Sequence, residues 1–202
     1  MNSILRTILL PLTLGALLTG CVGSGALPEQ RFYRLPEPRP TPVANPVITR
    51  SLGIPRLRAN GLYHERALLH FVPEQPLDLR PYHYHHWSDS PTLLIRDHLA
   101  SYLGAAGAVR EISRFQDEGR AEQKLYGRLI RFEREVTTTR IVVHIALEFS
   151  LDAGHQVLLP AKRYEVRQEA ADRTVHSTVQ AFGTALEAIY GELLADLRTV
   201  TR

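Results

Sequence analysis

Apolar and polar residues alternate along much of the chain, most clearly in the segment "TRIVVHIALEFSL", residues 139–151. Successive side chains of a β-strand point to opposite faces of a sheet. The alternation therefore predicts a strand with one buried face and one mostly polar face. The residues expected on the buried face are Thr139, Ile141, Val143, Ile145, Leu147, Phe149 and Leu151.

The segments on either side, "KLYGRLIRFEREV" and "QVLLPAKRYEVRQ", share this pattern and predict strands that pair with it as an antiparallel meander. Asp152-Ala153-Gly154 is a suitable hairpin connection between the last two strands. Three earlier segments, "PVITRSLGIP", "ERALLHFV" and "LDLRPYHYHHW", also predict strands, with an Asn60-Gly61 turn signal after the first of them. We therefore expect a mixed, largely antiparallel sheet.

Two segments have helical spacing instead. The first begins at Ser90-Pro91, a favourable N-cap followed by a favourable first helical residue, and Gly104 is a natural stop. The second begins near Ser177 and continues almost to the C-terminus. Strands combined with two amphipathic helices predict an α/β fold. A dinucleotide-binding fold is excluded, because the glycine fingerprint that it needs is absent.

The first 20 residues predict a secretory signal peptide. A single basic residue, Arg6, precedes an apolar run from Ile8 to Leu18 that is too short to span a membrane permanently. The stretch Leu18-Thr19-Gly20-Cys21 resembles the bacterial lipobox. This resemblance implies cleavage after Gly20, a diacylglycerol on the Cys21 thiol and an acyl chain on the new amine. Apart from this covalent lipid, we expect no cofactor.

Cys21 is the only cysteine, so the exported chain has no intramolecular disulfide. Two or more acyl chains hold a protein firmly on a membrane. Lipoproteins retained at the inner membrane carry Asp at the next position, whereas this chain has Val22. We therefore expect the protein on the periplasmic face of the outer membrane.

Residues 21–46 are predicted to be a lipidated tether, with a first short strand at Arg31 to Leu35 and a spacer, "PEPRPTPVANP", that holds five prolines. The alternative is disorder up to residue 46. Residues 47–202 are predicted to form a single domain.

The formal charge of +3 comes without a long basic block, which argues against a nucleic-acid partner. Neither a nucleophile elbow nor a phosphate loop is present, so we expect a protein that is not an enzyme.

The segment "PYHYHHW" raises the possibility of a metal site. Alternation along a strand places His83 and His85 on one face. Zinc needs three or four converging ligands, so other residues would have to complete the site. The candidates are Asp78, Asp89 and His70.

The favoured interpretation of the same segment is structural. Tyr82, Tyr84 and His86 fall on the opposite face of the predicted strand. We expect Tyr82, Tyr84 and Trp87 to pack on the first helix, because such amphipathic rings suit the border between core and water. The histidines would then lie on a polar face, and no metal is expected.

The order of these features resembles the ABC-type transport auxiliary lipoprotein family, which includes the paraquat-inducible protein C-like (PqiC) lipoproteins. A lipobox and the aromatic strand "RFYRL" are followed by "IPRLRANGLYHERALLHF" and "YHYHHWSDSPTLLIRDHLASYL". The strand pair "GRLIRFEREVTTTRIVVHIALEFSL" and the helix "AFGTALEAIYGELLADL" complete the match. The resemblance implies a three-layer α/β/α sandwich, with Tyr82, Tyr84 and Trp87 as a structural signature.

The resemblance also implies a function. It indicates an accessory subunit of an intermembrane lipid transport system, in which an ABC transporter works with a periplasmic MCE-domain protein that forms a hydrophobic passage. The lipoprotein would dock this passage to the outer membrane, and a homo-oligomer would suit that position. Two alternatives stay open: a tethered periplasmic metal-binding protein or enzyme centred on His83 and His85, and a purely structural envelope lipoprotein.

Overall fold

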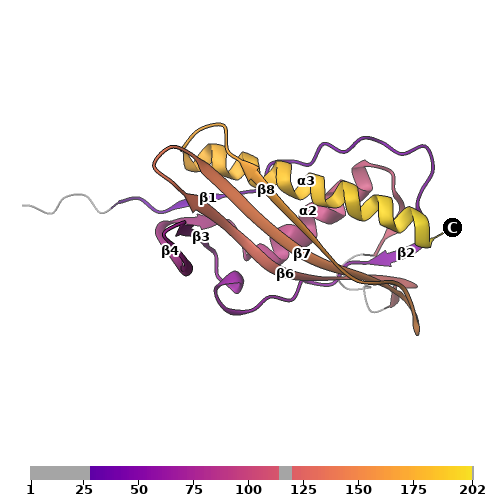
Figure 1. The fold of residues 1–202 in the computed structure, drawn as a ribbon. Coiled ribbons are helices and arrows are strands. Elements are labelled where there is room, and N and C mark those ends of the chain that lie inside the picture. The colour runs from indigo at the N-terminus through magenta and orange to yellow at the C-terminus, as the bar shows by residue number, and fades with distance from the viewer. Residues whose placement is uncertain (1–27, 114–119, 202) are drawn as a thin grey trace, which may run out of the picture.

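The computed structural model describes residues 28–113 and 120–201 (Figure 1). The predicted signal peptide (1–20), the Gly20 cleavage site and Cys21 lie outside the described residues. The strands are β1 (Arg31–Tyr33), β2 (Ile48–Gly53), β3 (Ala67–Val72), β4 (Gln75–Trp87), β5 (Val109–Ile112), β6 (Gln123–Val136), β7 (Ile141–Ala153) and β8 (Gln156–Glu169). The helices are η1 (Gly61–His64), a 3-10 helix, and the α-helices α2 (Pro91–Ala105) and α3 (Val175–Val200).

The described strands form one mixed sheet organised around β6. Strand β7 pairs antiparallel along the whole of β6, and β8 pairs antiparallel with β7, which confirms the predicted meander. The hairpin between β7 and β8 turns at Gly154, whose φ of +61° suits a glycine. The other edge of β6 is shared in series by β2 and β3, both parallel to it. Strand β4 pairs antiparallel with β3, while β1 is parallel to β4 and β5 to β2.

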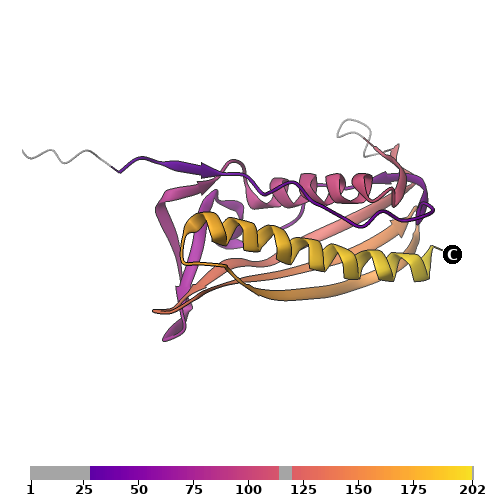
Figure 2. The same ribbon diagram turned by 90° about the horizontal axis from the view of Figure 1, so that it is seen from above.

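The two α-helices, α2 and α3, lie on the same face of the sheet, and Figure 2 shows them running alongside each other above the long strands. The Tyr190 hydroxyl of α3 donates a hydrogen bond to the Ile95 carbonyl of α2 at 3.3 Å. Ile145, Leu147 and the other alternate apolar residues of β7 join the same core. The α/β class, the mixed sheet and the two amphipathic helices are therefore confirmed.

The structure has two layers where three were expected, because the second face of the sheet carries no described helix longer than η1. The physical reason lies in the residues of this face. Arg128, Glu148 and Arg163 occupy neighbouring positions on β6, β7 and β8, and both arginines are exposed. Such a charged surface gives an amphipathic helix little apolar area to cover.

The helix boundaries follow their capping residues. Helix α2 begins at Pro91 after the N-cap Ser90, as predicted. Helix α3 begins at Val175, slightly before the predicted Ser177, because the Thr174 hydroxyl caps it by accepting a hydrogen bond from the Ser177 N–H at 3.1 Å. Strand β5 was not predicted, since its four residues are too few to show an alternating pattern.

The proline-rich segment, residues 36–46, packs along the two helices. The His98 Nε2–H of α2 donates to the Pro36 carbonyl at 2.9 Å. The Arg39 N–H donates to Oε1 of Glu187 in α3 at 3.2 Å. The segment therefore belongs to the folded body, and its interpretation as a spacer ahead of the domain is wrong. An extended proline-rich backbone has no internal hydrogen bonds, so its free groups are available to the helices.

Candidate functional site

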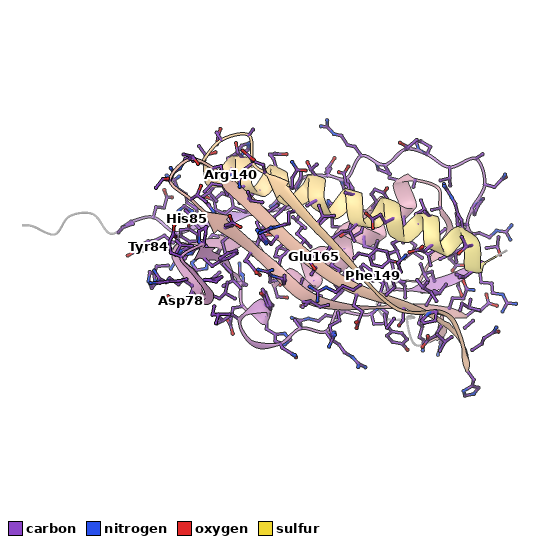
Figure 3. The ribbon with its side chains drawn as sticks, viewed as in Figure 1. Asp78, Tyr84, His85, Arg140, Phe149 and Glu165 are labelled. Carbon is purple, nitrogen blue, oxygen red and sulfur yellow. The ribbon has the colours of Figure 1, made fainter. Side chains whose placement is uncertain are left out.

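The His- and Tyr-rich half of β4 lies at the end of the molecule where the described chain begins. Strand β1 pairs with it in parallel, with Arg31 opposite His85 and Tyr33 opposite Trp87. Figure 3 shows Tyr84, His85 and Asp78 together at this end. We call this region, made of β1, β4 and the β3–β4 turn, the tether end, because the chain towards Cys21 leaves from it.

Strand β4 is irregular where the alternation was predicted. Leu69 of β3 pairs with Pro81, whereas Ala67 pairs with His86, so extra residues of β4 are accommodated as a bulge. As a result, the rings of Tyr82 and His85 meet edge-on at 5.5 Å. The prediction that these two residues point to opposite faces is wrong, because a bulge shifts the alternation of side chains.

The three residues of the predicted structural signature lie in different environments. Trp87 is only 1% exposed, and its ring contacts Phe132 of β6 and Phe182 of α3 at 5.1 and 5.3 Å between centroids. Tyr82 is half-buried, whereas Tyr84 is 39% exposed. Packing of all three on the first helix is therefore wrong for Tyr84, and the ring contacts of Trp87 come from the sheet and from the second helix.

The histidines of β4 each have a different neighbour. His85 Nδ1 lies 2.8 Å from the Tyr33 hydroxyl, and burial lowers the pKa of His85, with Arg31 and Arg134 adding to the effect. His86 stacks on Phe32 at 5.6 Å between ring centroids. His83 contacts the ring of its neighbour Tyr84. Of the three histidines of β4, His85 and His86 are therefore partly buried, whereas His83 is exposed.

The side chains proposed to complete a metal site do not join His83 and His85. The Asp78 carboxylate pairs with the Arg80 guanidinium, and Asp89 Oδ1 accepts a hydrogen bond from the Ser90 N–H at 2.6 Å. His70 packs on Tyr82 with 4.2 Å between ring centroids. Within residues 28–113 and 120–201, no group of three or more His, Cys, Asp or Glu side chains is arranged to hold a metal ion.

A buried cation, Arg134, lies behind this strand and was missed by the sequence analysis. It is 4% exposed, and among the described residues its Nε and Nη1 atoms have no hydrogen-bond partner. The guanidinium lies over the Tyr82 ring at 5.5 Å, a cation–π contact. Burial lowers the pKa of Arg134, and nearby Arg173 adds to the effect. In the sequence, Arg134 belongs to a run of alternating charged residues. This pattern predicts a solvent-exposed face, so it does not indicate that Arg134 is buried.

The helix-free face of the sheet carries a second polar cluster, centred on Glu133. This carboxylate is 3% exposed and accepts hydrogen bonds from the Tyr63 hydroxyl at 2.5 Å and from Arg131 Nε at 2.7 Å. Burial raises the pKa of the Tyr63 hydroxyl, and the bond to Glu133 adds to the effect. The Phe132 N–H also donates to it, at 3.0 Å. Because the carboxylate is held by these three donors, the cluster attaches η1 to the sheet and Glu133 is not a free acid or base.

Two of the open hollows formed by the described residues lie towards opposite ends of the molecule. One, of about 560 Å³, lies at the tether end between β1 and the start of α3. The other, of about 450 Å³, is lined by three arginines, Arg56, Arg58 and Arg128, and by two carboxylates, Glu148 and Asp152. Arg56 is already held by hydrogen bonds to hydroxyls of the α2 N-terminus. Charged walls of both signs suit contact with a protein partner better than a small apolar ligand.

In the part of the chain that the structure describes, neither α2 nor α3 is long and apolar enough to cross a membrane.

The fold and the motif order define an α/β envelope domain of a known class. The family model described as ABC-type transport auxiliary lipoprotein component matches residues 33–193, so the chain belongs to this family. The match covers nearly all the described elements, from β1 into α3. It makes the protein an auxiliary lipoprotein component of ABC-type transport, as the resemblance implied. Among curated proteins, none matches the chain significantly.

Solved structures share the fold. The crystal structure of protein XCC0632 from Xanthomonas campestris, of family DUF330, has a TM-score of 0.69 at 21% identity, over 81% of this chain and 92% of that one. An uncharacterised protein has a TM-score of 0.64 at 12% identity, over 83% and 98% of the two chains. The hypothetical protein CT253 from Chlamydia trachomatis has a TM-score of 0.50 at 8% identity, over 76% and 98%. At these identities the likeness concerns the fold alone.

Proposed function

We propose that this auxiliary lipoprotein is held on the periplasmic face of the outer membrane by lipid on Cys21. There it serves as an accessory subunit of an MCE/ABC-type lipid transport system. The observation that carries the proposal is the family match over residues 33–193, combined with a lipobox cysteine only a few residues upstream of the described domain. The function is positional: the domain docks the periplasmic passage of an MCE-domain protein to the membrane.

The short tether supports a direct docking role. Seven residue steps join Cys21 to Pro28, the first described residue. When fully extended, they span at most about 25 Å. Since residues 36–46 pack on the helices, they add nothing to this reach. The folded body would therefore lie close to the membrane that holds the lipid, where a passage ending at that membrane can meet it.

The proposal includes a location at the outer membrane and a homo-oligomeric state. Val22, in place of the Asp that retains lipoproteins at the inner membrane, supports delivery to the outer membrane. A homo-oligomer would match a ring-shaped partner, because repeated subunits form closed symmetric assemblies. We propose no catalytic step and no cofactor other than the covalent lipid. No observation among the described residues favours the metal-binding alternative centred on His83 and His85.

Crosslinking in intact envelopes tests this proposal. The acylated protein is crosslinked, purified and analysed by mass spectrometry, with the Cys21→Ser variant as control. We expect an MCE-domain protein to be recovered with the acylated protein from the outer-membrane fraction, and the variant to leave that fraction. Recovery of unrelated envelope proteins alone would overturn the transport role. A variant that still sediments with outer membranes would overturn the lipid anchor.

A further inference from the structure

The direction of two paired strands shows which end of the domain is nearest the lipid. Strands β1 and β4 are parallel, so their N-terminal ends lie at the same end of the sheet. The N-terminal end of β1 leads back towards Cys21, while that of β4 is the β3–β4 turn. This turn and the indigo start of the described chain therefore lie at the same end of the molecule (Figure 1).

This end exposes large hydrophobic side chains. Leu77, just after the β3–β4 turn, is 97% exposed. Phe32 of β1 and Tyr84 of β4 are 55% and 39% exposed. Single exposed apolar residues are ordinary, but several at one end of a small domain indicate a contact surface.

The exposed rings lie among cations. The Arg66 guanidinium lies over the Phe32 ring at 5.2 Å, and Phe32 stacks on His86. Exposed Arg31 and Arg34 flank Phe32 in the chain. Acidic groups are also present, because Asp78 pairs with Arg80 and Glu29 lines the nearby hollow. Aromatic rings and arginines together are the residues that proteins place at the interface between lipid headgroups and water.

We propose that Leu77, Phe32 and Tyr84 form a membrane-docking surface that rests on the bilayer carrying the Cys21 lipid. This inference rests on the proposed lipidation. The short tether limits the occupant: the described chain begins at this same end, and its first residue, Pro28, lies within about 25 Å of Cys21. Leu77 would enter the apolar region, while the two rings and the arginines would lie among the headgroups.

This surface also orients the domain. The β7–β8 hairpin and the C-terminus lie at the other end of the molecule (Figure 1). A domain resting on its tether end therefore points this hairpin into the periplasm. The hollow lined by Arg58, by Arg128 of β6 and by Asp152 of β7 lies towards this end, where a periplasmic partner can reach it.

A single engineered thiol tests the docking surface in the full acylated protein. Since Cys21 is the only cysteine and its thiol carries the lipid, Leu77→Cys introduces the only free thiol. Val157→Cys is the matched control, because Val157 is also exposed, at 56%, but lies on β8 beside the distal hairpin. Each variant is labelled with an environment-sensitive fluorophore. It is then reconstituted into vesicles of phosphatidylethanolamine and phosphatidylglycerol, with and without spin-labelled lipid.

We expect the label at position 77 to shift to shorter emission wavelengths on reconstitution and to lose at least half of its intensity to spin-labelled lipid. The label at position 157 should do neither. The same emission shift and quenching at both positions would overturn the docking surface. Shielding of the label at position 77 that grows with the number of protein copies per vesicle would also overturn it, because the label would then contact other copies of the protein. The mass of each purified variant is measured first. A protein that lacks the lipid mass contradicts the anchor itself, whereas an acylated protein with a water-exposed label at position 77 contradicts only the docking surface.

Discussion

Trp87 and Phe182 meet edge-on, with 5.3 Å between ring centroids, and so join the His- and Tyr-rich strand to the C-terminal helix. Phe132 of β6 completes the group, at 4.4 Å from Phe182 and 5.1 Å from Trp87. The three rings fix α3 to the sheet directly behind the tether end. This aromatic cluster therefore helps to hold the tether end against the rest of the domain, together with the pairing of β3 with β6.

Phe182→Ala is expected to lower the free energy of unfolding by about 3–5 kcal/mol, because it leaves a cavity between two buried rings. Denaturant unfolding followed by tryptophan fluorescence measures this loss, since Trp87 is the only tryptophan and is 1% exposed. Val157→Ala, at an exposed position, should change the free energy by no more than about 0.5 kcal/mol. A loss below about 1 kcal/mol for Phe182→Ala would contradict the role of the cluster.

Gly183→Ala is expected to destabilise the protein by displacing the proline-rich segment from α3. A Cβ at this position would lie 2.2 Å from Pro36 Cγ, and the proline ring has little freedom to move away. We expect a loss of about 1–3 kcal/mol in the free energy of unfolding, as for other overpacked sites.

Gly191→Ala in the same helix is the matched control. A Cβ there would meet only the Tyr102 hydroxyl, at 3.9 Å, so the helix propensity of alanine should stabilise the variant by up to about 1 kcal/mol. Equal stability of the two variants in denaturant unfolding would contradict the contact between Pro36 and α3. Faster proteolytic cleavage within residues 36–46 should accompany the loss in Gly183→Ala.

Features set by local pattern could be predicted from the sequence. The alternation of β7 predicted its buried face from Ile141 to Leu151, although the predicted Thr139 lies before the strand and is exposed. Ser90 and Pro91 predicted the start of α2. Features set by contacts between distant segments could not be predicted. The docking of residues 36–46 depends on the missing Cβ of Gly183, and the arrangement of Tyr82 and His85 depends on a bulge against β3. The burial of Glu133 and Arg134 also depends on contacts with distant segments, so it could not be predicted from the charged sequence of β6.

Tyr63→Phe is expected to lower the free energy of unfolding by about 1–3 kcal/mol, because it removes one donor from a buried carboxylate. Glu133 would keep Arg131 but lose the 2.5 Å bond that attaches η1 to the sheet. Tyr126→Phe, at an exposed position, provides the control and should be nearly neutral. Denaturant unfolding measures both variants, and an unchanged stability of Tyr63→Phe would mean that this hydroxyl does not hold η1.

Acidification below pH 7 is expected to destabilise the protein through its buried histidines. Burial lowers the pKa of His98, and it also lowers the pKa values of His70, His85 and His144. A histidine whose pKa is lowered by folding binds fewer protons in the folded state than in the unfolded state. Its contribution is therefore fully present above the ordinary pKa of 6.5 and is lost as the pH falls below that value towards the lowered pKa. Aspartates with lowered pKa values, such as Asp196, affect the stability of the protein only below pH 4. The change in stability between pH 7 and 5 is therefore assigned to the histidines.

His98→Gln should make the stability of the protein less dependent on pH between 7 and 5. Glutamine keeps a donor for the Pro36 carbonyl but has no proton to gain, so one contribution of up to about 1.4 kcal/mol per pH unit disappears. Denaturant unfolding at half-unit intervals of pH gives the slope for the wild type and the variant. A His98→Gln slope equal to that of the wild type would mean that His98 takes up its proton as readily in the folded protein as in the unfolded chain.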